Sequence, residues 1–558
     1  MSSDTPISKI RRHFSQLKQE RLTWEPHWLE AQEYVVPQRG RHIKASGKTD
    51  INNGNRDTSR RLSGVASRAL GVLASGMQSG LTSKARQWFL LGHPDPELNR
   101  YQPVREWYGM VQEVLEGVFR RSNIYTAFLH TYHEMAAFGQ GAMAMYSHPE
   151  KTMFCRPHTV GTYYMSSDAS GEIDTFFYTE WLTAGQLVET YGREVLPHSV
   201  TSAYDTGRYV DRFEVVHGFL KHPERYGIKL KAIHNVSSVH FLASADGNDG
   251  FLRESGYRTW PVMTPRWDVI DQDVYGWSPT RDVIDDVKMV MAMERDALKG
   301  TAKAANPPWR IPPELDRRGL DTRPGALNPV SSMSEHAVAP LFTQMPNLQQ
   351  LQYKIDAIKE DIKDGYYNSL FLALLSRDNP QMTAREVAER HEEKLLMLGP
   401  VLERIHMELL DPAIDRAFAI AWDEGLIPPP PAELEGQPTK VEYVSILSQA
   451  QKAVGVNRIE QSVGFLGSVT QIYPEARHLL DVERTVREYS NMIGAPAVIF
   501  RSGEEYADAV RQEQQQAQMA QGVAVGSQAA QGVKALGDID PANVQTLLAG
   551  TESGGLVL

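Results

Sequence analysis

Gly47, Lys48 and Thr49 are the first residues whose types and spacing could do chemistry, because a Gly-Lys-Ser/Thr triplet closes a phosphate-binding loop. Such a loop needs a first glycine five positions before Gly47, so that consecutive backbone N–H groups surround the phosphates. His42 occupies that position. The turn-rich sequence after Thr49 does not predict the helix that must follow. We therefore expect no nucleotide site here.

Two groups of side chains could hold a metal ion. His130 and His133 are three residues apart on an expected helix, but the sequence offers no third ligand near them, which favours packed histidines. Asp282, Asp285 and Asp286 follow an expected helix start at Ser278, where carboxylates interact favourably with the helix dipole. We expect neither a metal nor a cofactor.

Hydrolase motifs are missing from the sequence. It contains no His-Glu-x-x-His and no Gly-x-Ser-x-Gly, and Ser79 between Gly76 and Gly80 has the wrong register for a nucleophile elbow. These glycines lie in a helical pattern, where small residues permit close packing of helices. We therefore expect that the chain is not an enzyme.

Composition limits the remaining classes. The chain has 558 residues, enough for three to four units of about 150 residues each. Its net charge of −11 argues against a free-standing, sequence-independent nucleic-acid binder. Its single cysteine, Cys155, excludes an intrachain disulfide and suits a reducing compartment. With no run of 18 apolar residues and no secretory signal, we expect no membrane span and a protein that stays in the cytosol.

The first half of the chain predicts helices followed by a sheet. Apolar residues recur at helical spacing over residues 8–36, 63–81, 104–119 and 125–145. Between the first two of these segments, residues 39–61 carry seven Lys and Arg and read as a basic loop. From Thr152 to Tyr275 short alternating runs predict an antiparallel sheet unit with a helix near residues 183–191.

Two long amphipathic helices then flank a segment rich in Pro and Gly. The helices are expected over 279–305 and 347–372, and the segment over 306–346. We expect the two helices to return antiparallel. A lone extended hairpin leaves apolar stripes uncovered, whereas copies of it around a closed ring bury them against their neighbours. This pattern is typical of a channel wall.

The last third predicts one longer helix and a weakly structured tail. Thr383 and Glu386 form a capping box that opens a helix to about Asp423, with bends expected at Gly399-Pro400 and Pro412. Residues 441–447 predict a strand, and helical spacing follows to about Met492. The Gln-rich sequence after Arg511 fits either a polar helix or disorder.

Five segments, in this order, resemble the head-to-tail connecting (portal) proteins of short-tailed phages. They are LASGMQSGLTSKARQWFLL within 72–91, AFGQGAM at 137–143, VYGWSPTRDVIDDVKMV at 274–290, MTAREVAERHEEKLLMLGPVLERI at 382–405 and VEYVSILSQAQKA at 441–453. Lys84 and Gln87 stand where the family pattern has prolines, and Trp277 replaces an arginine. The resemblance covers residues 10–500, and the ordered set carries it rather than any single motif.

The resemblance implies an α+β fold, predominantly α, of the portal type. Its parts would be a wing (1–278, with helices in 8–150 and a β-rich part in 151–278), stem helices (279–305 and 347–372), a clip (306–346), a tunnel loop (373–383), a kinked helix with a linker (384–440), a crown (441–510) and a Gln/Ala/Gly-rich tail (511–558).

The resemblance also implies a function. Twelve copies would form a ring at one capsid vertex of the virion, after assembly in the cytoplasm of a host bacterium. Double-stranded DNA would pass through it without sequence preference, driven by a separate terminase. Partners would be the terminase large subunit, a tail adaptor, and the major capsid and scaffolding proteins. A tail tube or scaffold protein, or a packaging ATPase, is the alternative.

Three residue sets are the candidate site. The tunnel loop would present Arg377, Asp378, Asn379 and Gln381 to DNA, unless these only form a turn. In the clip, contacts with partners or a brace between subunits would come from Trp309, Arg310, Arg317, Arg318 and Arg323. Packing of stem and ring would come from Leu351, Ile355, Ile358, Ile362, Val387, Leu395 and Leu402.

Overall fold

The computed structural model describes most of the chain up to residue 448. The described residues are 5–39, 43, 61–95, 98–99, 101–244, 250–305, 309–310, 339–340, 348–375, 384–434, 440–445, 447–448, 462–470, 473, 485–486 and 511. By its internal contacts the chain divides into two units, Met1–Asn457 and Arg458–Leu558. In the second unit, residues 462–470 form a helix. All other elements below belong to the first unit.

Helices dominate the N-terminal part, as predicted. They are α1 (Pro6–Arg21), α2 (Glu25–Tyr34), α4 (Val65–Leu81), α6 (Gln102–Arg121) and α7 (Ile124–Phe138). Helix α1 begins where the Thr5 hydroxyl accepts the backbone N–H of Ser8, with Pro6 in its first turn. Its buried residues Ile10, Phe14 and Leu17 recur every three or four positions and fix the face that packs inward.

The prediction that α7 continues to Met145 is wrong. Gly139, with φ of 90°, ends the helix in a left-handed conformation, and strand β2 (Ala142–His148) follows. The apolar run Ala142–Met145 is buried on every side chain and has no alternation, so its sequence fits a buried strand or a buried helix equally well.

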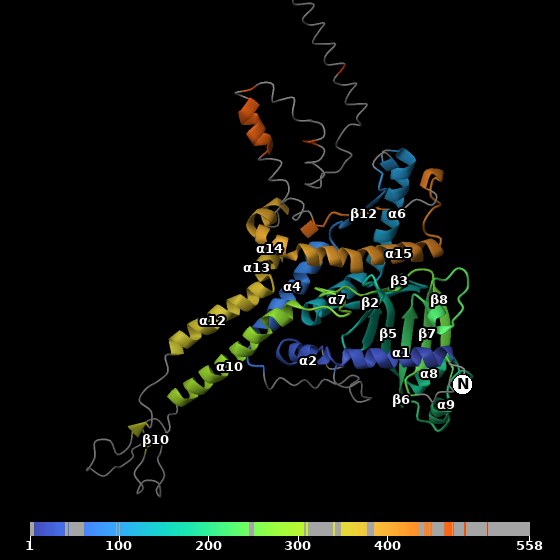
Figure 1. The fold of residues 1–558 in the computed structure, drawn as a ribbon, viewed down its shortest axis with the longest axis horizontal. Coiled ribbons are helices and arrows are strands. Elements are labelled where there is room, and N and C mark those ends of the chain that lie inside the picture. The colour runs from blue at the N-terminus through green and yellow to red at the C-terminus, as the bar shows by residue number, and fades with distance from the viewer. Residues whose placement is uncertain are drawn as a thin grey trace, which may run out of the picture. The chain divides into compact units, whose positions relative to one another are not determined.

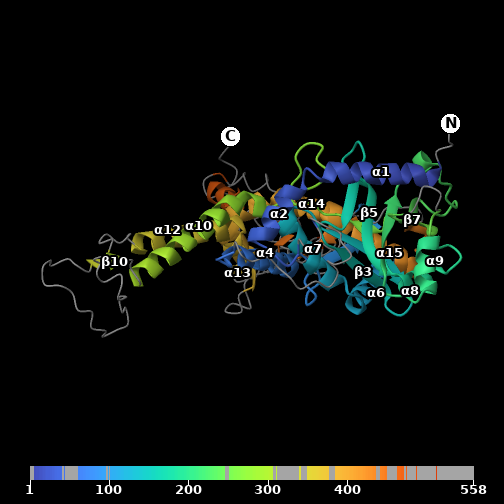
Figure 2. The same cartoon turned by 90° about the horizontal axis from the view of Figure 1, so that it is seen from below.

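The predicted antiparallel sheet unit is confirmed, and it contains two sheets. Strands β3 (Thr152–His158), β2 and β9 (Val262–Met263) form the smaller sheet in the order β3-β2-β9. The larger sheet has five consecutive antiparallel strands: β4 (Tyr163–Ser167), β5 (Ile173–Thr183), β6 (Arg212–Leu220), β7 (Val236–Leu242) and β8 (Arg253–Tyr257). Helix α1 lies along this sheet (Figures 1 and 2). The Phe14 ring centroid lies 5.0 Å from that of Tyr164 and 5.5 Å from that of Phe177.

Short helical elements lie in the connections between strands of the larger sheet. Helix α8 (Ala184–Tyr191) was predicted, and its first turn has a capping box between Thr183 and Gln186. Helix α9 (His198–Asp205) and the 3-10 turn η1 (Pro223–Tyr226) were not predicted, because α9 is rich in the weak helix formers Ser, Thr and Asp and η1 has only four residues.

The next elements form a helical hairpin. They are α10 (Pro279–Ala305), β10 (Trp309–Arg310), β11 (Ala339–Pro340), α12 (Leu348–Gly365) and α13 (Asn368–Leu375), and β10 pairs antiparallel with β11. The helix predicted over 279–305 is confirmed at both ends. The single helix predicted over 347–372 is wrong, because the chain breaks at Tyr367, whose φ of 55° is left-handed.

One long helical run closes the first unit. It comprises α14 (Ala384–Ile405), the π-helical turn η2 (His406–Leu410) and α15 (Asp411–Asp423), and the 3-10 turn η3 (Ala432–Leu434) follows. Pro400 lies inside α14 and Pro412 in the first turn of α15, where the two bends were predicted. Thr383 of the predicted capping box lies outside the described residues.

Strand β12 (Lys440–Tyr443) confirms the strand predicted near residue 441. It pairs antiparallel with β1 (Phe89–Gly92), far away in the sequence. The first compact unit therefore extends to Asn457, so the beginning of the segment expected as a crown from residue 441 folds with the N-terminal part.

Candidate functional site

The two long helices of the hairpin lie antiparallel and close together (Figure 1). A Cβ added to Gly365 of α12 would stand 2.3 Å from the Val283 side chain of α10. Farther along the hairpin, Lys359 Nζ lies 2.6 Å from Glu294 Oε1. The missing side chain at Gly365 therefore lets the helix backbones approach at one end, and an ion pair joins the helices beyond it.

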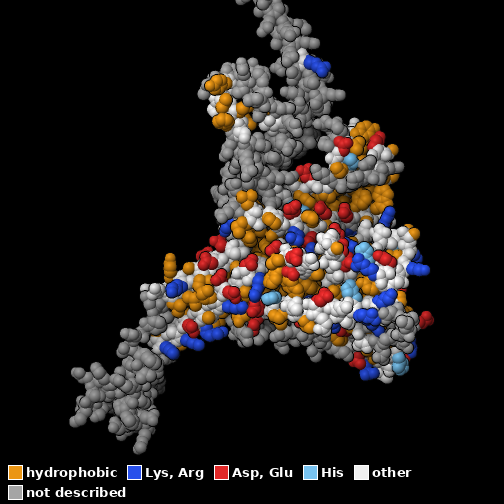
Figure 3. All heavy atoms as spheres, viewed as in Figure 1, with side chains coloured by type: hydrophobic (Ala, Val, Ile, Leu, Met, Phe, Trp, Pro, Cys, Tyr) orange, Lys and Arg blue, Asp and Glu red, His pale blue; other side chains and the backbone are white. Residues whose placement is uncertain are grey.

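On α10, only the part of the helix at the base of the hairpin is buried, whereas α12 also buries Ile355 farther out. The buried residues of α10 end at Met291, and none of residues 292–305 is buried. Beyond the base, apolar side chains lie open: Leu298 is 59% exposed and Tyr353 is 77% exposed. Figure 3 shows hydrophobic and charged side chains intermixed on this hairpin. Exposed apolar side chains of this kind are typical of a surface that contacts another protein.

A buried hydroxyl cluster fixes the base. Thr280 Oγ1 donates to the Ala136 carbonyl at 2.8 Å and lies 2.8 Å from the Tyr366 hydroxyl. Burial raises the pKa of Tyr366, which keeps its phenol neutral. The cluster joins the end of α7, the start of α10 and the break after α12. It accounts for that break, because the chain turns where Tyr366 enters the core.

The backbones at Gly139 and Gly276 cross beside this hydroxyl cluster, at a point that we call the glycine crossing. A Cβ on Gly139 would meet the Gly276 carbonyl oxygen at 2.0 Å, and a Cβ on Gly276 would meet the Gly139 carbonyl oxygen at 2.2 Å. The Gly139 carbonyl accepts the Trp267 N–H at 2.7 Å, and the Gly276 N–H donates to Gln140 Oε1 at 3.2 Å. The segments 137–143 and 274–290, picked out separately in the sequence, thus meet in space.

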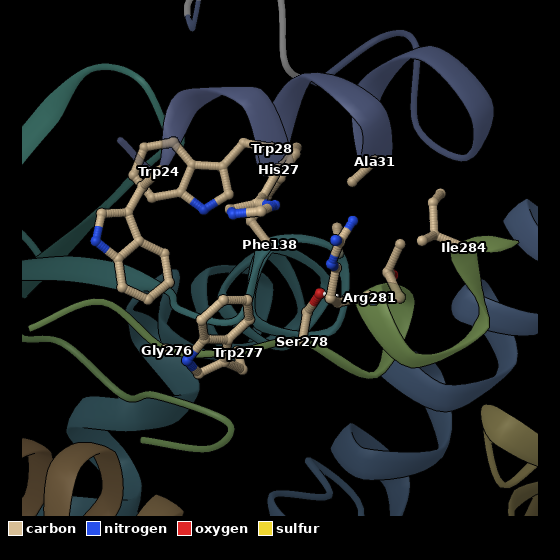
Figure 4. Close-up of a pocket in the computed structure, with 12 residues that line it drawn as sticks. Trp24, His27, Trp28, Ala31, Phe138, Gly276, Trp277, Ser278, Arg281 and Ile284 are labelled. Atoms are coloured by element: carbon tan, nitrogen blue, oxygen red, sulfur yellow. Dashed lines mark hydrogen bonds between the residues drawn. The ribbon is translucent and has the colours of Figure 1, made fainter. Parts of the chain in front are cut away.

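Aromatic side chains cover the crossing (Figure 4). The Trp277 ring centroid lies 5.0 Å from that of Trp24 and 5.5 Å from that of His27, and Trp277 Nε1 donates to Asp273 at 3.0 Å. Arg281 pairs with Glu30 at 2.7 Å. The cavity between these groups measures about 20 Å³, room for little more than one water molecule. This is a packed anchor for the start of α10 rather than a ligand pocket.

The ionisable residues considered as metal ligands are packed or paired. Burial lowers the pKa of His130 to about 4 and of His133 to about 3. Glu134 beside them pairs with Arg39 at 2.9 Å and accepts the Val160 N–H. Within the described part of the chain, no group of three or more His, Cys, Asp or Glu residues is arranged to hold a metal ion.

The carboxylates at the start of α10 face water or a cation. Lys288 Nζ lies 3.4 Å from Asp285, whose side chain is exposed, and 3.1 Å from Glu30. Burial, followed by the charge of Asp268, raises the pKa of Asp282.

Among the helices that the structure describes, none has both the length and the hydropathy needed to cross a membrane.

Most of the predicted packing residues are already buried in one chain. Ile355, Ile362, Leu395 and Leu402 are at most 1% exposed. Leu351 and Ile358 are half-buried, and Val387 lies in α14 with its side chain outside the described part. The stripe therefore packs mainly within the chain, whereas Leu298 and Tyr353, which were not among the predicted packing residues, are exposed.

The predicted clip and tunnel-loop residues are mostly outside the described structure. Trp309 and Arg310 lie in β10, whose pairing with β11 brings the two ends of residues 311–338 together. The residues outside the described part are Arg317, Arg318, Arg323, Arg377, Asp378, Asn379 and Gln381. Of the basic segment 39–61, the structure describes Arg39, Ile43 and Arg61.

Comparison with known proteins gives relatives that align over nearly the whole of this chain. The chain is 34% identical to the portal protein of Salmonella phage epsilon15 over 558 residues, 99% of each chain. It is 34% identical to the probable portal protein of Bordetella phage BPP-1 over 550 residues, 98% of each. A chain in the neck of an empty gene transfer agent particle is 13% identical, with a TM-score of 0.32, over 72% of this chain and 85% of that one.

The model of one protein family, the bacteriophage head to tail connecting proteins, matches residues 8–500. This range includes the hairpin, the glycine crossing at its base and the long helical run. The chain belongs to the bacteriophage head to tail connecting protein family.

Proposed function

We propose that this chain is a portal protein: copies of it form a ring at one capsid vertex of the virion, and double-stranded DNA enters and leaves through the ring. The observation that carries the proposal is the identity of 34% with a portal protein along 99% of both chains. The hairpin supports it, because its distal half exposes apolar residues that a neighbouring copy could cover.

The proposed ring has twelve copies with their hairpins side by side around the channel. Twelve chains with a net charge of −11 carry about −132 in total. Where such charge faces the channel, it repels the DNA backbone over about 8 Å at physiological salt. DNA would then slide without adsorbing, and Arg377 in the proposed tunnel loop would touch phosphates only briefly.

The proposed partners follow from the same assignment. Residues 306–346 would be the clip that docks the terminase large subunit and later a tail adaptor, with Trp309, Arg310, Arg317, Arg318 and Arg323 at the contact. Major capsid and scaffolding proteins would surround the ring during assembly in the host cytoplasm. The terminase would supply ATP hydrolysis, so the chain itself would need no enzyme activity.

Replacing residues 311–338 with Asn-Gly tests the clip. Because Arg310 pairs with Ala339, a two-residue turn can close the chain there without disturbing the hairpin. We expect rings of unchanged size that no longer bind terminase or package DNA. A matched control replaces only Arg317 and Arg318 with Gln, which tests the charge without shortening the chain. Packaging by the shortened protein would refute the clip assignment, and loss of the ring would assign the segment to a brace between subunits.

A further inference from the structure

The η2 turn is an irregular element inside the long helical run. The Asp411 N–H bonds to the His406 carbonyl, five residues back, whereas α-helical bonds span four. Pro412, which follows, explains the turn. A proline has no N–H to donate to the carbonyl four residues back, and in an uninterrupted α-helix its ring would clash with the Glu408 carbonyl. Such turns are rare and recur at functional sites.

A partly buried ion pair contacts this turn on one side. Arg266 Nη2 lies 2.6 Å from Glu408 Oε1, and the Arg266 backbone N–H donates to Glu408 Oε2 at 2.8 Å. The two side chains are 6% and 19% exposed. Arg266 also donates to the Gly171 carbonyl at 3.0 Å. Arg266 belongs to residues 264–278, a segment that we call the strap. The strap passes through the glycine crossing and leads into α10.

The helices on either side of the turn are attached to different parts of the unit. Before the turn, Lys394 of α14 bonds to Asp364 at 2.8 Å and to Ser369 at 2.6 Å, on either side of the break between α12 and α13. After the turn, Arg416 of α15 bonds to Thr259 at 2.9 Å, beside the sheets. The turn therefore lies between a hairpin-bound helix and a sheet-bound helix.

Open space lies beside the turn. A cavity of about 420 Å³ is lined by Met407, Glu408 and Pro412 on the helical side and by the strap and residues 170–173 on the other. Met407 is 64% exposed. On this side no packing covers the turn, and the contact between Arg266 and Glu408 holds it. On the opposite side Leu409 and Leu410 are buried, and His406 stacks on Tyr443 with ring centroids 4.1 Å apart.

We propose that η2 is a hinge between α14 and α15, and that Arg266 and Glu408 are the positioning residues that latch it. When the latch opens, α14 moves with the junction of α12 and α13 while α15 stays on the sheets. The inference concerns a single chain, so it goes beyond the proposed function and stands independently of the number of copies in a ring.

Distance measurement between spin labels tests the hinge. Labels go on Met397→Cys in α14 and Val210→Cys beside β6, both more than 60% exposed. The native Cys155 is buried, and burial raises its pKa to about 12, so it stays unlabelled in the folded protein. Mixing labelled chains with an excess of unlabelled full-length chains isolates the distance within one chain.

We expect one distance in the otherwise unchanged protein and a second population in Glu408→Gln, with the folded near-ultraviolet circular dichroism kept. Arg266→Lys, which retains the charge but not the two-point contact, should give a smaller second population. Arg404→Gln is the matched control, because Arg404 approaches the same carboxylate only to 3.7 Å, and it should leave the distance unchanged.

Two results would overturn the proposal: an unchanged distance in Glu408→Gln, or the same second population in Arg404→Gln. If Glu408→Gln does not fold, deletion of the exposed Met407 decides the question. It removes the additional residue of the turn and should rotate α14 by about 100° and shift it by about 1.5 Å. An unchanged distance in that deletion would also refute the hinge.

Discussion

Gly276→Ala and Gly71→Ala are the same chemical change with opposite predicted effects on the free energy of unfolding. Gly276 is buried at the glycine crossing, where the new Cβ would meet the Gly139 carbonyl oxygen at 2.2 Å. Gly71 lies within α4, and nothing is within 4 Å of its Cβ position. The comparison isolates the crossing from general effects of replacing glycine with alanine.

The magnitude follows from the geometry. An ordinary contact begins near 3.4 Å, so the two backbones must separate by about 1.2 Å at Gly276. Overpacking of this kind costs about 1–3 kcal/mol. The separation also weakens the bonds from Trp267 N–H to the Gly139 carbonyl and from Gly276 N–H to Gln140, at about 1 kcal/mol each. We expect a loss of about 3–5 kcal/mol for Gly276→Ala and a gain of about 0.5–1 kcal/mol for Gly71→Ala.

Urea unfolding of the two purified variants, followed by tryptophan fluorescence and circular dichroism, measures both values. Hydrogen exchange in the start of α10 should rise in Gly276→Ala and stay unchanged in Gly71→Ala. A free energy of unfolding for Gly276→Ala within about 0.5 kcal/mol of the unaltered chain would show that the crossing does not anchor the hairpin.

Further predictions concern packing, pH and the thiol. Ile362→Ala should lower the free energy of unfolding by about 2–5 kcal/mol in urea titrations, whereas Leu298→Ser should leave it within about 0.5 kcal/mol but weaken association of copies in native mass spectrometry. Because the pKa values of His130 and His133 lie at about 4 and 3 in the folded chain and near 6.5 in the unfolded one, the unfolded state binds more protons below pH 6.5. The free energy of unfolding should therefore fall as pH drops from 6.5 to 4, by up to about 1.4 kcal/mol per pH unit for each histidine, and His133→Leu should reduce that slope in melts across this range. Cys155 should react with a thiol reagent only in denaturant, and rapid labelling of the folded chain would contradict its burial.

The elements with strong local signals could be predicted from sequence. The helix at Pro279–Ala305 has a long apolar period and clear ends, and the short apolar runs bounded by turn residues correspond to strands β5, β6 and β7. The break at Tyr367 could not be predicted, because its cause is a hydrogen bond between Tyr366 and Thr280, which are 86 residues apart. Local propensity does not contain such tertiary contacts.

The candidate site was predictable in outline only. Gly139 and Gly276 each stood in a noted motif, but nothing in either motif shows that the two residues touch. Glu408 and Arg266 gave no signal, since each is an ordinary charged residue until the fold buries them together. The stripe containing Ile362 and Leu402 was found correctly as apolar, but periodicity does not distinguish burial within a chain from burial between chains.

Native mass spectrometry of the purified full-length protein, combined with negative-stain class averages, tests the central claim most directly. The proposal predicts a ring of about 750 kDa, twelve times the 62.6 kDa chain, with a central opening wide enough for duplex DNA. A closed dimer, or a compact particle without a central opening, would contradict it.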